Sequence, residues 1–300
     1  MVSHWVWKIV VTLSMTRVKF LAILLGIAIA ALAIFLVVRS DAALVFHPKG
    51  IIAHSELRLI ITNVCLMLSV IVPTGILLLF TAWKYRSSNV ENEYRPEKIV
   101  GTWGQIGLWA IPSVVIAVMV VITWNATHTL DPYRPLKSEK EPLRIQVVAL
   151  DWKWLFIYPE QGIATVNFVQ FPAGIPIRFE LSADNSPMNS FWIPQLSGQI
   201  YTMTGMVTPL HIMADGPGEY SGKAVEINGE GYADMTFVAK SCSQADFDEW
   251  IRSVKSSPLR LTRAEYKDLS RRSVNRQVVL FSSVEENLFF NIVMTPMEPQ

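Results

Sequence analysis

The chain has 300 residues, 51% of them hydrophobic, with 26 Lys and Arg against 25 Asp and Glu. This content is too apolar for an ordinary soluble domain. The charge is uneven, because residues 1–130 hold ten Lys and Arg against five Asp and Glu, and residues 131–300 hold sixteen against twenty. Neither part carries the dense basic patch that nucleic acid requires, so nucleic-acid binding is excluded. The two cysteines, Cys65 and Cys242, are not expected to form a disulfide.

The first uncharged apolar run covers residues 20–38. As a helix it would rise about 28 Å, enough to cross the hydrocarbon core of a membrane. It also fits a secretory signal, because Ser40, Asp41 and Ala42 offer small residues in the spacing that a signal peptidase prefers. We therefore expect residues 1–42 to be either a signal segment or a first membrane segment.

Two further apolar runs predict a transmembrane helical hairpin within residues 43–130. They span about residues 59–83 and 104–126 and contain Pro73 and Pro112. Neighbouring helices can satisfy the carbonyl groups that such prolines free. The basic N-terminus and the basic loop between the two runs predict, by the positive-inside rule, that the rest of the chain lies outside the cytoplasm.

Residues 131–242 contain short β-like stretches separated by turn residues. The expected strands are Leu143–Leu150, Trp154–Tyr158, Ile175–Leu181, Leu210–Ala214 and Met235–Ala239. Short strands at this spacing are typical of a β-sandwich or barrel of about 100 residues.

Residues 243–300 return to helical signals. Ser243 and Asp246 have the spacing of a capping box, and Thr262 and Glu265 repeat it, so two short helices are expected. The following tail is aromatic, with these phenylalanines: Phe281, Phe289 and Phe290. We expect the tail to pack against the protein, because three exposed phenylalanines would favour aggregation.

Three stretches carry a family resemblance. Asp151–Trp154 reads DWKW, Asn189–Pro194 reads NSFWIP, and Gly222–Met235 reads GKAVEINGEGYADM. Together with the hairpin they resemble subunit II of the haem–copper oxidases. In the branch that oxidises cytochrome c, the last stretch has the form G-x-C-x-E-x-C-G-x-x-H-x-x-M. With an earlier histidine it holds a dinuclear copper centre.

The copper-ligand positions of that frame carry other side chains here. Asn189 and Tyr232 occupy the two histidine positions, and Ala224 and Asn228 occupy the two cysteine positions. Glu226 and Met235 keep the pattern. A mixed-valence copper pair needs bridging thiolates and imidazoles. A methyl group has no donor atom, carboxamides are poor copper ligands, and a phenol is deprotonated only near pH 10. We therefore expect no metal and no other cofactor in this chain, and no catalytic residue.

The stretch from residue 148 to 200 resembles subunit II of the quinol oxidases of the cytochrome bo type. The resemblance implies a membrane α-helical hairpin with the N-terminal signal or extra helix, an all-β cupredoxin-like extracytoplasmic domain and a short helical, aromatic-rich C-terminal region. It also implies a proton-pumping ubiquinol oxidase of the aerobic respiratory chain, in which this chain is a structural and assembly subunit. The haems, the copper and the quinol-oxidising site would belong to subunit I.

The same resemblance implies further partners and a location. The partners would be subunit I, smaller membrane subunits and membrane lipids, with ubiquinol bound by the complex. The location would be the bacterial inner membrane, crossed more than once, with the C-terminal domain in the periplasm. Possible interface residues are Trp152, Trp154 and Glu226. The alternative function is a membrane-anchored extracytoplasmic binding protein with a cupredoxin-like domain.

Overall fold

The computed structural model describes residues 25–26, 28–29, 32–40, 43–86, 89, 101–184, 188–274 and 277–295. The chain divides into two compact units, residues 1–47 and 48–300. In the first unit, residues 25–26, 28–29 and 32–39 are helical, and a short 3-10 turn, η1 (Leu44–Phe46), follows. The start of the predicted first span and the candidate cleavage residues Asp41 and Ala42 lie outside the described residues. The expected divisions after residues 42, 130 and 242 stay predictions.

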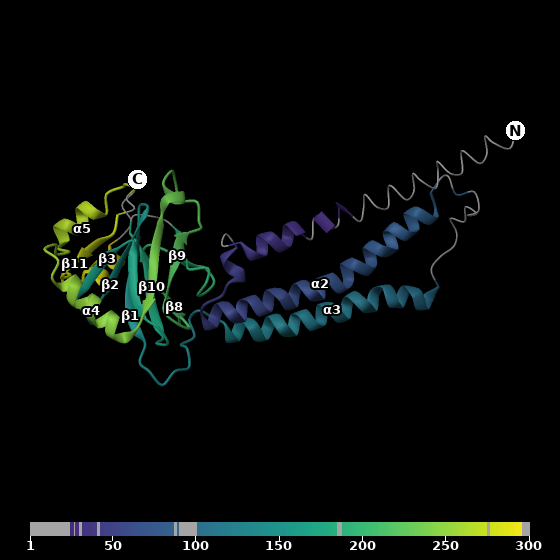
Figure 1. The fold of residues 1–300 in the computed structure, drawn as a ribbon, viewed down its shortest axis with the longest axis horizontal. Coiled ribbons are helices and arrows are strands. Elements are labelled where there is room, and N and C mark those ends of the chain that lie inside the picture. The colour runs from purple at the N-terminus through teal and green to yellow at the C-terminus, as the bar shows by residue number, and fades with distance from the viewer. Residues whose placement is uncertain are drawn as a thin grey trace. The chain divides into compact units, whose positions relative to one another are not determined.

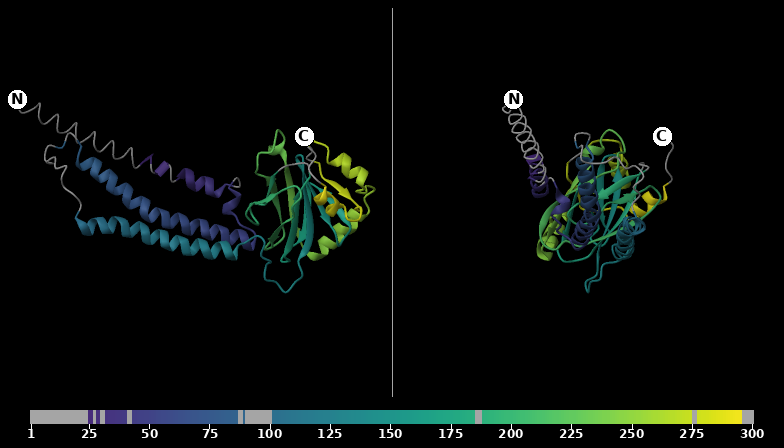
Figure 2. Two further views of the ribbon diagram at one scale, coloured as in Figure 1. Left: turned by 180° about the vertical axis from the view of Figure 1, so that it is seen from behind. Right: turned by 90° about the vertical axis from the view of Figure 1, so that its right-hand side faces the viewer.

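The second unit begins with the hairpin that the apolar runs predict. Helix α2 (Ile51–Lys84) and helix α3 (Thr102–Thr129) lie side by side (Figures 1 and 2). Both are long and apolar enough to cross a membrane, and each contains its proline, Pro73 and Pro112. The hairpin prediction is confirmed.

Helix α2 begins well before the uncharged run at residue 59 because its first turns bind the β-domain. His54 Nε2 lies 2.9 Å from Asp215 Oδ2, and Glu56 Oε1 accepts a hydrogen bond of 2.9 Å from the backbone N–H of Gly198. The backbone N–H of Ala53 donates to the carbonyl of Leu196 at 3.3 Å. Two turns of α2 therefore join the hairpin to the outer domain.

In the described part of the chain, two sheets form a β-sandwich. The first has the strand order β11 (Val279–Phe281), β3 (Ile163–Val166), β2 (Lys153–Tyr158), β1 (Leu143–Leu150), β5 (Ile177–Ala183), β8 (Thr208–Ile212). The second has the order β4 (Phe168–Pro172), β10 (Thr236–Cys242), β9 (Gly218–Ala224), β6 (Asn189–Trp192), β7 (Ile200–Thr202). The five expected strands are present as β1, β2, β5, β8 and β10, with ends shifted by no more than three residues.

Aromatic side chains fill the space between the sheets. Members of this core include Trp154, Phe156, Phe179, Phe191 and Phe237. Trp154 meets Phe191 edge to face at 5.2 Å between ring centroids, and Phe191 stacks on Phe237 at 5.0 Å. Each fully buried phenylalanine contributes about 1.5–3 kcal/mol, so this core fixes the strands that carry the site.

The C-terminal region packs on the sandwich in two places: its first helix adds buried side chains to the main core, and the segment after that helix covers the outer face of the first sheet. Helix α4 (Gln244–Lys255) begins at Ser243, whose Oγ accepts from the N–H of Asp246 at 3.1 Å. Helix α5 (Arg263–Leu269) begins at Thr262, whose Oγ1 accepts from the N–H of Glu265 at 3.3 Å. Both cap predictions are confirmed.

The aromatic tail forms β11 and helix α6 (Leu288–Met294). Phe281 and Phe289 are buried with Val148 and Leu155 of the first sheet, as expected. Phe290 is 58% exposed, so the expectation that all three phenylalanines are packed is wrong for this one. Successive residues on a helix point about 100° apart, so a helix that turns Phe289 inward turns Phe290 toward solvent.

Candidate functional site

The copper-ligand positions that the resemblance implies lie on strands β6 and β9 and on the loop that follows β9. Strand β6 begins with Asn189, strand β9 ends with Ala224, and the two strands pair with Phe191 opposite Ala224. This register places the loop after β9 beside the start of β6. The chain then forms the short 3-10 turn η2 (Tyr232–Asp234), and Met235 leads into β10.

Asn189 and Asn228 contact each other directly. The side-chain Nδ2 of Asn228 donates a hydrogen bond to Oδ1 of Asn189, which is completely buried. A second bond ties the same loop to β6, because the backbone N–H of Val225 donates to Oγ of Ser190 at 3.0 Å. Thus the positions where the resemblance implies a histidine and a cysteine are joined by the carboxamides of Asn189 and Asn228.

The other two positions meet through Met235. The backbone N–H of Ala224 donates to the carbonyl of Met235 at 3.0 Å, and the N–H of Met235 donates to the carbonyl of Tyr232 at 3.1 Å. Ala224 and Met235 are buried, and Tyr232 is partly buried against the main core. The structure therefore gathers all four predicted positions into one small region.

The donor atoms in this region do not fit a copper pair. Ala224 offers no donor, and the bond between Asn228 and Asn189 turns one carboxamide nitrogen toward the other residue's oxygen. A copper pair needs bridging thiolates, which delocalise charge over two metals, and the two positions where the resemblance implies them carry a methyl group and an amide. Among the described residues, no three His, Cys, Asp or Glu side chains lie where they could hold a metal ion. The residues present do not suit the group that the wider family holds here.

Trp152 lies between this loop and the C-terminal region. It adopts a left-handed backbone conformation with φ of 66° and is 6% exposed. Gly231 packs on its indole so closely that a Cβ would lie 2.3 Å from the nearest ring atom. On the indole also lies the Arg272 guanidinium, with Cζ 4.7 Å from a ring centroid, and Arg272 Nε is 3.8 Å from Asp151 Oδ2. A glycine is required at position 231 because the Trp152 ring leaves no room for a Cβ atom.

Hydrogen bonds to other segments of the domain fix Trp154 and Lys153. The indole Nε1 of Trp154 donates to the carbonyl of Met235 at 3.4 Å, and its backbone N–H donates to Oδ1 of Asn167 at 2.9 Å. Lys153 Nζ donates to the carbonyl of Arg271 at 2.7 Å and to Oγ of Ser273 at 2.6 Å. Burial lowers the pKa of Lys153. The aromatic motif is thus a structural junction, and Trp154 belongs to the core.

Sequence reasoning missed the C-terminal half of this junction. Arg271, Arg272 and Ser273 meet the DWKW motif across more than a hundred residues of chain. Their polar stretch contains no local pattern that would connect it with Trp152. Glu226, by contrast, was singled out; it is partly buried at the loop and makes no ion pair with any residue that the structure describes.

A membrane-length hairpin and a β-sandwich together define a class: a membrane-anchored protein with a β-sandwich outer domain. Comparison with known proteins narrows the class. The chain is 46% identical over 248 residues to cytochrome bo(3) ubiquinol oxidase subunit 2 of Pseudomonas aeruginosa, covering 83% of this chain and 75% of that protein. It is 44% identical over 251 residues to ubiquinol oxidase subunit 2 of Acetobacter aceti, covering 83% and 81%. The chain belongs to the ubiquinol oxidase subunit 2 family.

The chain also matches a family model and a solved structure. The family model described as the COX Aromatic Rich Motif matches residues 255–300. The periplasmic domain of subunit II of cytochrome oxidase of Bradyrhizobium japonicum matches with a TM-score of 0.37 and 18% identity, over 40% of this chain and 96% of that one.

Proposed function

We propose that this chain is the metal-free subunit II of a proton-pumping complex that oxidises ubiquinol and reduces oxygen to water. The haems, the copper and the quinol-oxidising site belong to subunit I, and this chain contributes no catalytic residue. The observation that carries the proposal is the hydrogen bond from Asn228 to Asn189, which joins two side chains where a copper centre would need a thiolate and an imidazole.

The loss of the metal has a physical reason in the nature of the electron donor. A cytochrome is a water-soluble protein that delivers electrons from outside the membrane, so it needs a relay metal in the outer domain. Ubiquinol is lipid-soluble and reaches subunit I within the bilayer. The relay then has no role, and only the fold that positions the loop is kept.

The chain's own contribution is structural. Exposed apolar side chains line α2 and α3, and they would pack against subunit I and lipid. At the tip of the lost metal loop, Ile227 is 73% exposed next to Glu226. We assign this tip to the contact with subunit I, so that the outer domain forms a cap over it. The smaller membrane subunits complete the complex.

The proposed location is the bacterial inner membrane, which the chain crosses more than once. The positive-inside rule puts the β-domain in the periplasm, because the basic residues of the first 130 positions gather in the N-terminus and the loop between the two apolar runs. The contacts of His54 and Glu56 with the β-domain then lie at the outer surface of the membrane.

Affinity purification in mild detergent tests this function. A tag on this chain should recover a haem-containing subunit together with ubiquinol oxidase activity. The substitution Ile227→Asp should weaken that recovery, because a charge would be buried in the contact. Leu259→Asp, at an exposed leucine on another surface, is the matched control. Recovery of the chain alone with a small ligand would instead favour the membrane-anchored binding protein.

A further inference from the structure

Three adjoining hollows lie along α3 and up to the junction with the β-domain, and we call them together the groove. Its lower part is lined by apolar and hydroxyl side chains: Ile116, Met119, Val120, Thr123, Trp124, Thr127. Its middle part lies between α2 and α3 and shares Thr123 and Thr127 with the lower part. Its upper part is a cavity of about 300 Å³ that shares Leu130 and Asp131 with the middle.

The part of the groove below the membrane interface has about the length of one leaflet. From Ile116 to Trp124, helix α3 rises about 12 Å, and one leaflet of a hydrocarbon core is about 15 Å thick, half of about 30 Å. Trp124 marks the level at which interfacial aromatic residues are expected. The lower groove is therefore at acyl-chain depth and the upper cavity at head-group depth.

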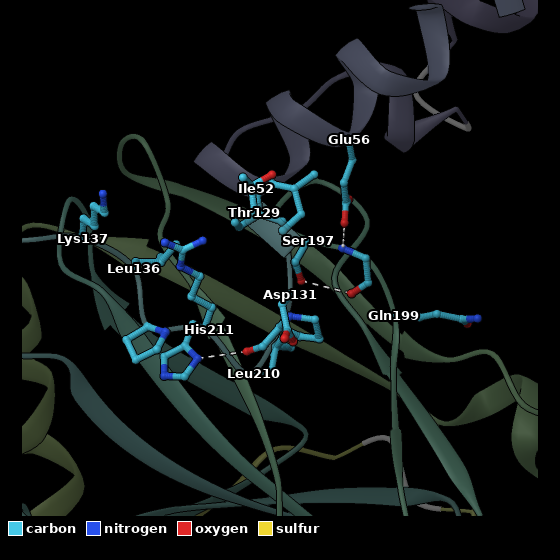
Figure 3. Close-up of a pocket in the computed structure, with 15 residues that line it drawn as sticks. Ile52, Glu56, Thr129, Asp131, Leu136, Lys137, Ser197, Gln199, Leu210 and His211 are labelled. Carbon is cyan, nitrogen blue, oxygen red and sulfur yellow. Dashed lines mark hydrogen bonds between the residues drawn. The ribbon is translucent and has the colours of Figure 1, made fainter. Parts of the chain in front are cut away.

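The upper cavity is lined by charges of both signs. Glu56 reaches from α2 toward the Ser197–Gly198 turn, and Asp131 and Lys137 lie on the loop after α3 (Figure 3). Arg134 also lines the cavity, and its Nη1 donates to the carbonyl of His128 at 3.1 Å.

The loop itself is fixed to strand β8, because His211 Nδ1 bonds the carbonyl of Pro132 at 2.9 Å. Two carboxylates, Glu56 and Asp131, and two cations, Arg134 and Lys137, line the same cavity. Within the described residues, none of the four makes an ion pair.

We propose that this groove binds a phospholipid with a primary-amine head group from the leaflet nearest the β-domain. The phosphate would contact Arg134 and Lys137, the ammonium group would contact Glu56 and Asp131, and an acyl chain would follow α3. Charged side chains at a membrane surface are stabilised by a partner of opposite charge. A zwitterion supplies both partners, whereas an uncharged quinol ring would leave all four charges without one.

Photo-crosslinking in vesicles tests the proposal. The full chain, with any subunits that co-purify, is placed in vesicles containing a phosphatidylethanolamine with a photoreactive acyl chain. We expect labelled peptides from residues 116–130. The double variant Arg134→Gln/Lys137→Gln should reduce this labelling about tenfold, as the loss of a charge-assisted contact does. Lys140→Gln, at an exposed lysine of the same loop outside the cavity, should leave it unchanged.

A second comparison separates the lipid classes. Glu56→Gln should abolish the preference for phosphatidylethanolamine over an equally photoreactive phosphatidylglycerol. Labelling near Trp83, at the far end of α2, serves as the folding control. Three outcomes would overturn the proposal. The first is equal labelling of the unmodified chain by both lipids, and the second is labelling of the groove by a photoreactive ubiquinone in place of phospholipid. The third is a parallel fall in labelling at both ends of the hairpin in the double variant. This readout needs no oxidase activity, so it stands or falls separately from the proposed function.

Discussion

The guanidinium of Arg272 lies over the indole of Trp152, with 4.7 Å between Cζ and a ring centroid. Gly231 also packs on that indole, with no room for a side chain. A residue of the C-terminal region and a residue of the loop after β9 therefore both pack on one tryptophan. Packing and hydrogen bonds thus fix the loop after β9 to the rest of the β-domain.

The substitution Gly231→Ala should destabilise the outer domain by about 1–3 kcal/mol, because the added methyl group would overlap the Trp152 ring. Denaturant unfolding of the detergent-solubilised chain, followed by tryptophan fluorescence, measures this change. Gly216→Ala is the control, since nothing lies within 4 Å of its Cβ position, and it should change the free energy of unfolding by less than about 0.5 kcal/mol. Equal effects of the two substitutions would contradict the proposed packing.

The pair Asn228 and Asn189 should be energetically coupled. Asn228→Ala removes the donor to a buried oxygen and should lower the free energy of unfolding by about 1–3 kcal/mol. A double-mutant cycle with Asn189→Ala should give an interaction energy of at least about 0.5 kcal/mol. Strictly additive effects would mean that the two carboxamides do not depend on each other.

Local signals in the sequence predicted a large part of this fold. Strand β1 has the expected ends, Leu143 and Leu150, because its first half alternates apolar and polar residues and its second half is apolar. The helices after Ser243 and Thr262 begin where their caps indicate, since capping involves residues only three apart. The membrane hairpin followed from length and hydropathy alone.

Non-local features escaped prediction. Strands β6 and β9, which carry the site, contain Asn189 and two glycines and lack a clear β pattern. They are strands because they pair with each other across a long stretch of chain. The four frame positions were identified by resemblance, but the direct bond between two of them was not. The contact of Arg272 with Trp152 could not be read from either segment by itself.

Lys153 should anchor the segment that contains Arg271 and Ser273. With Lys153→Met, the carbonyl of Arg271 loses a buried donor, and local opening of that segment becomes easier. Trypsin should then cleave after Arg271 or Arg272 at least about fivefold faster, because cleavage follows the population of the open state. The control is Lys240→Met, because the Lys240 side chain is 43% exposed and its amine lies 3.6 Å from Glu219 at the surface. An unchanged cleavage rate for Lys153→Met would refute the anchoring role.

Stability should fall in strongly alkaline solution. Burial raises the pKa of Tyr158, and burial together with the negative charge of Asp184 raises the pKa of Tyr266. The unfolded chain loses these protons near pH 10, while the folded chain keeps them, so the unfolded state binds fewer protons. The contribution of these two tyrosines to the free energy of unfolding is fully present below pH 10 and decreases as the pH rises above 10.

The slope of the unfolding free energy between pH 10 and pH 11.5 measures this effect. Each of the two tyrosines contributes up to about 1.4 kcal/mol per pH unit. Tyr158→Phe should lower the overall stability, because it removes a hydrogen bond to the carbonyl of Gln170, and should also flatten the slope. A slope that the substitution leaves unaltered would assign the alkaline loss to other groups.

Copper content tests the central claim most directly. The full chain, solubilised in detergent, is incubated with copper, washed and examined by metal mass spectrometry and near-infrared absorption. A variant with Asn189→His, Ala224→Cys, Asn228→Cys and Tyr232→His, which returns imidazole and sulfur to the four positions, is the positive control. The account predicts that the unmodified chain retains no more copper than a preparation without the protein and shows no near-infrared band. A stoichiometric copper pair with such a band in the unmodified chain would contradict it.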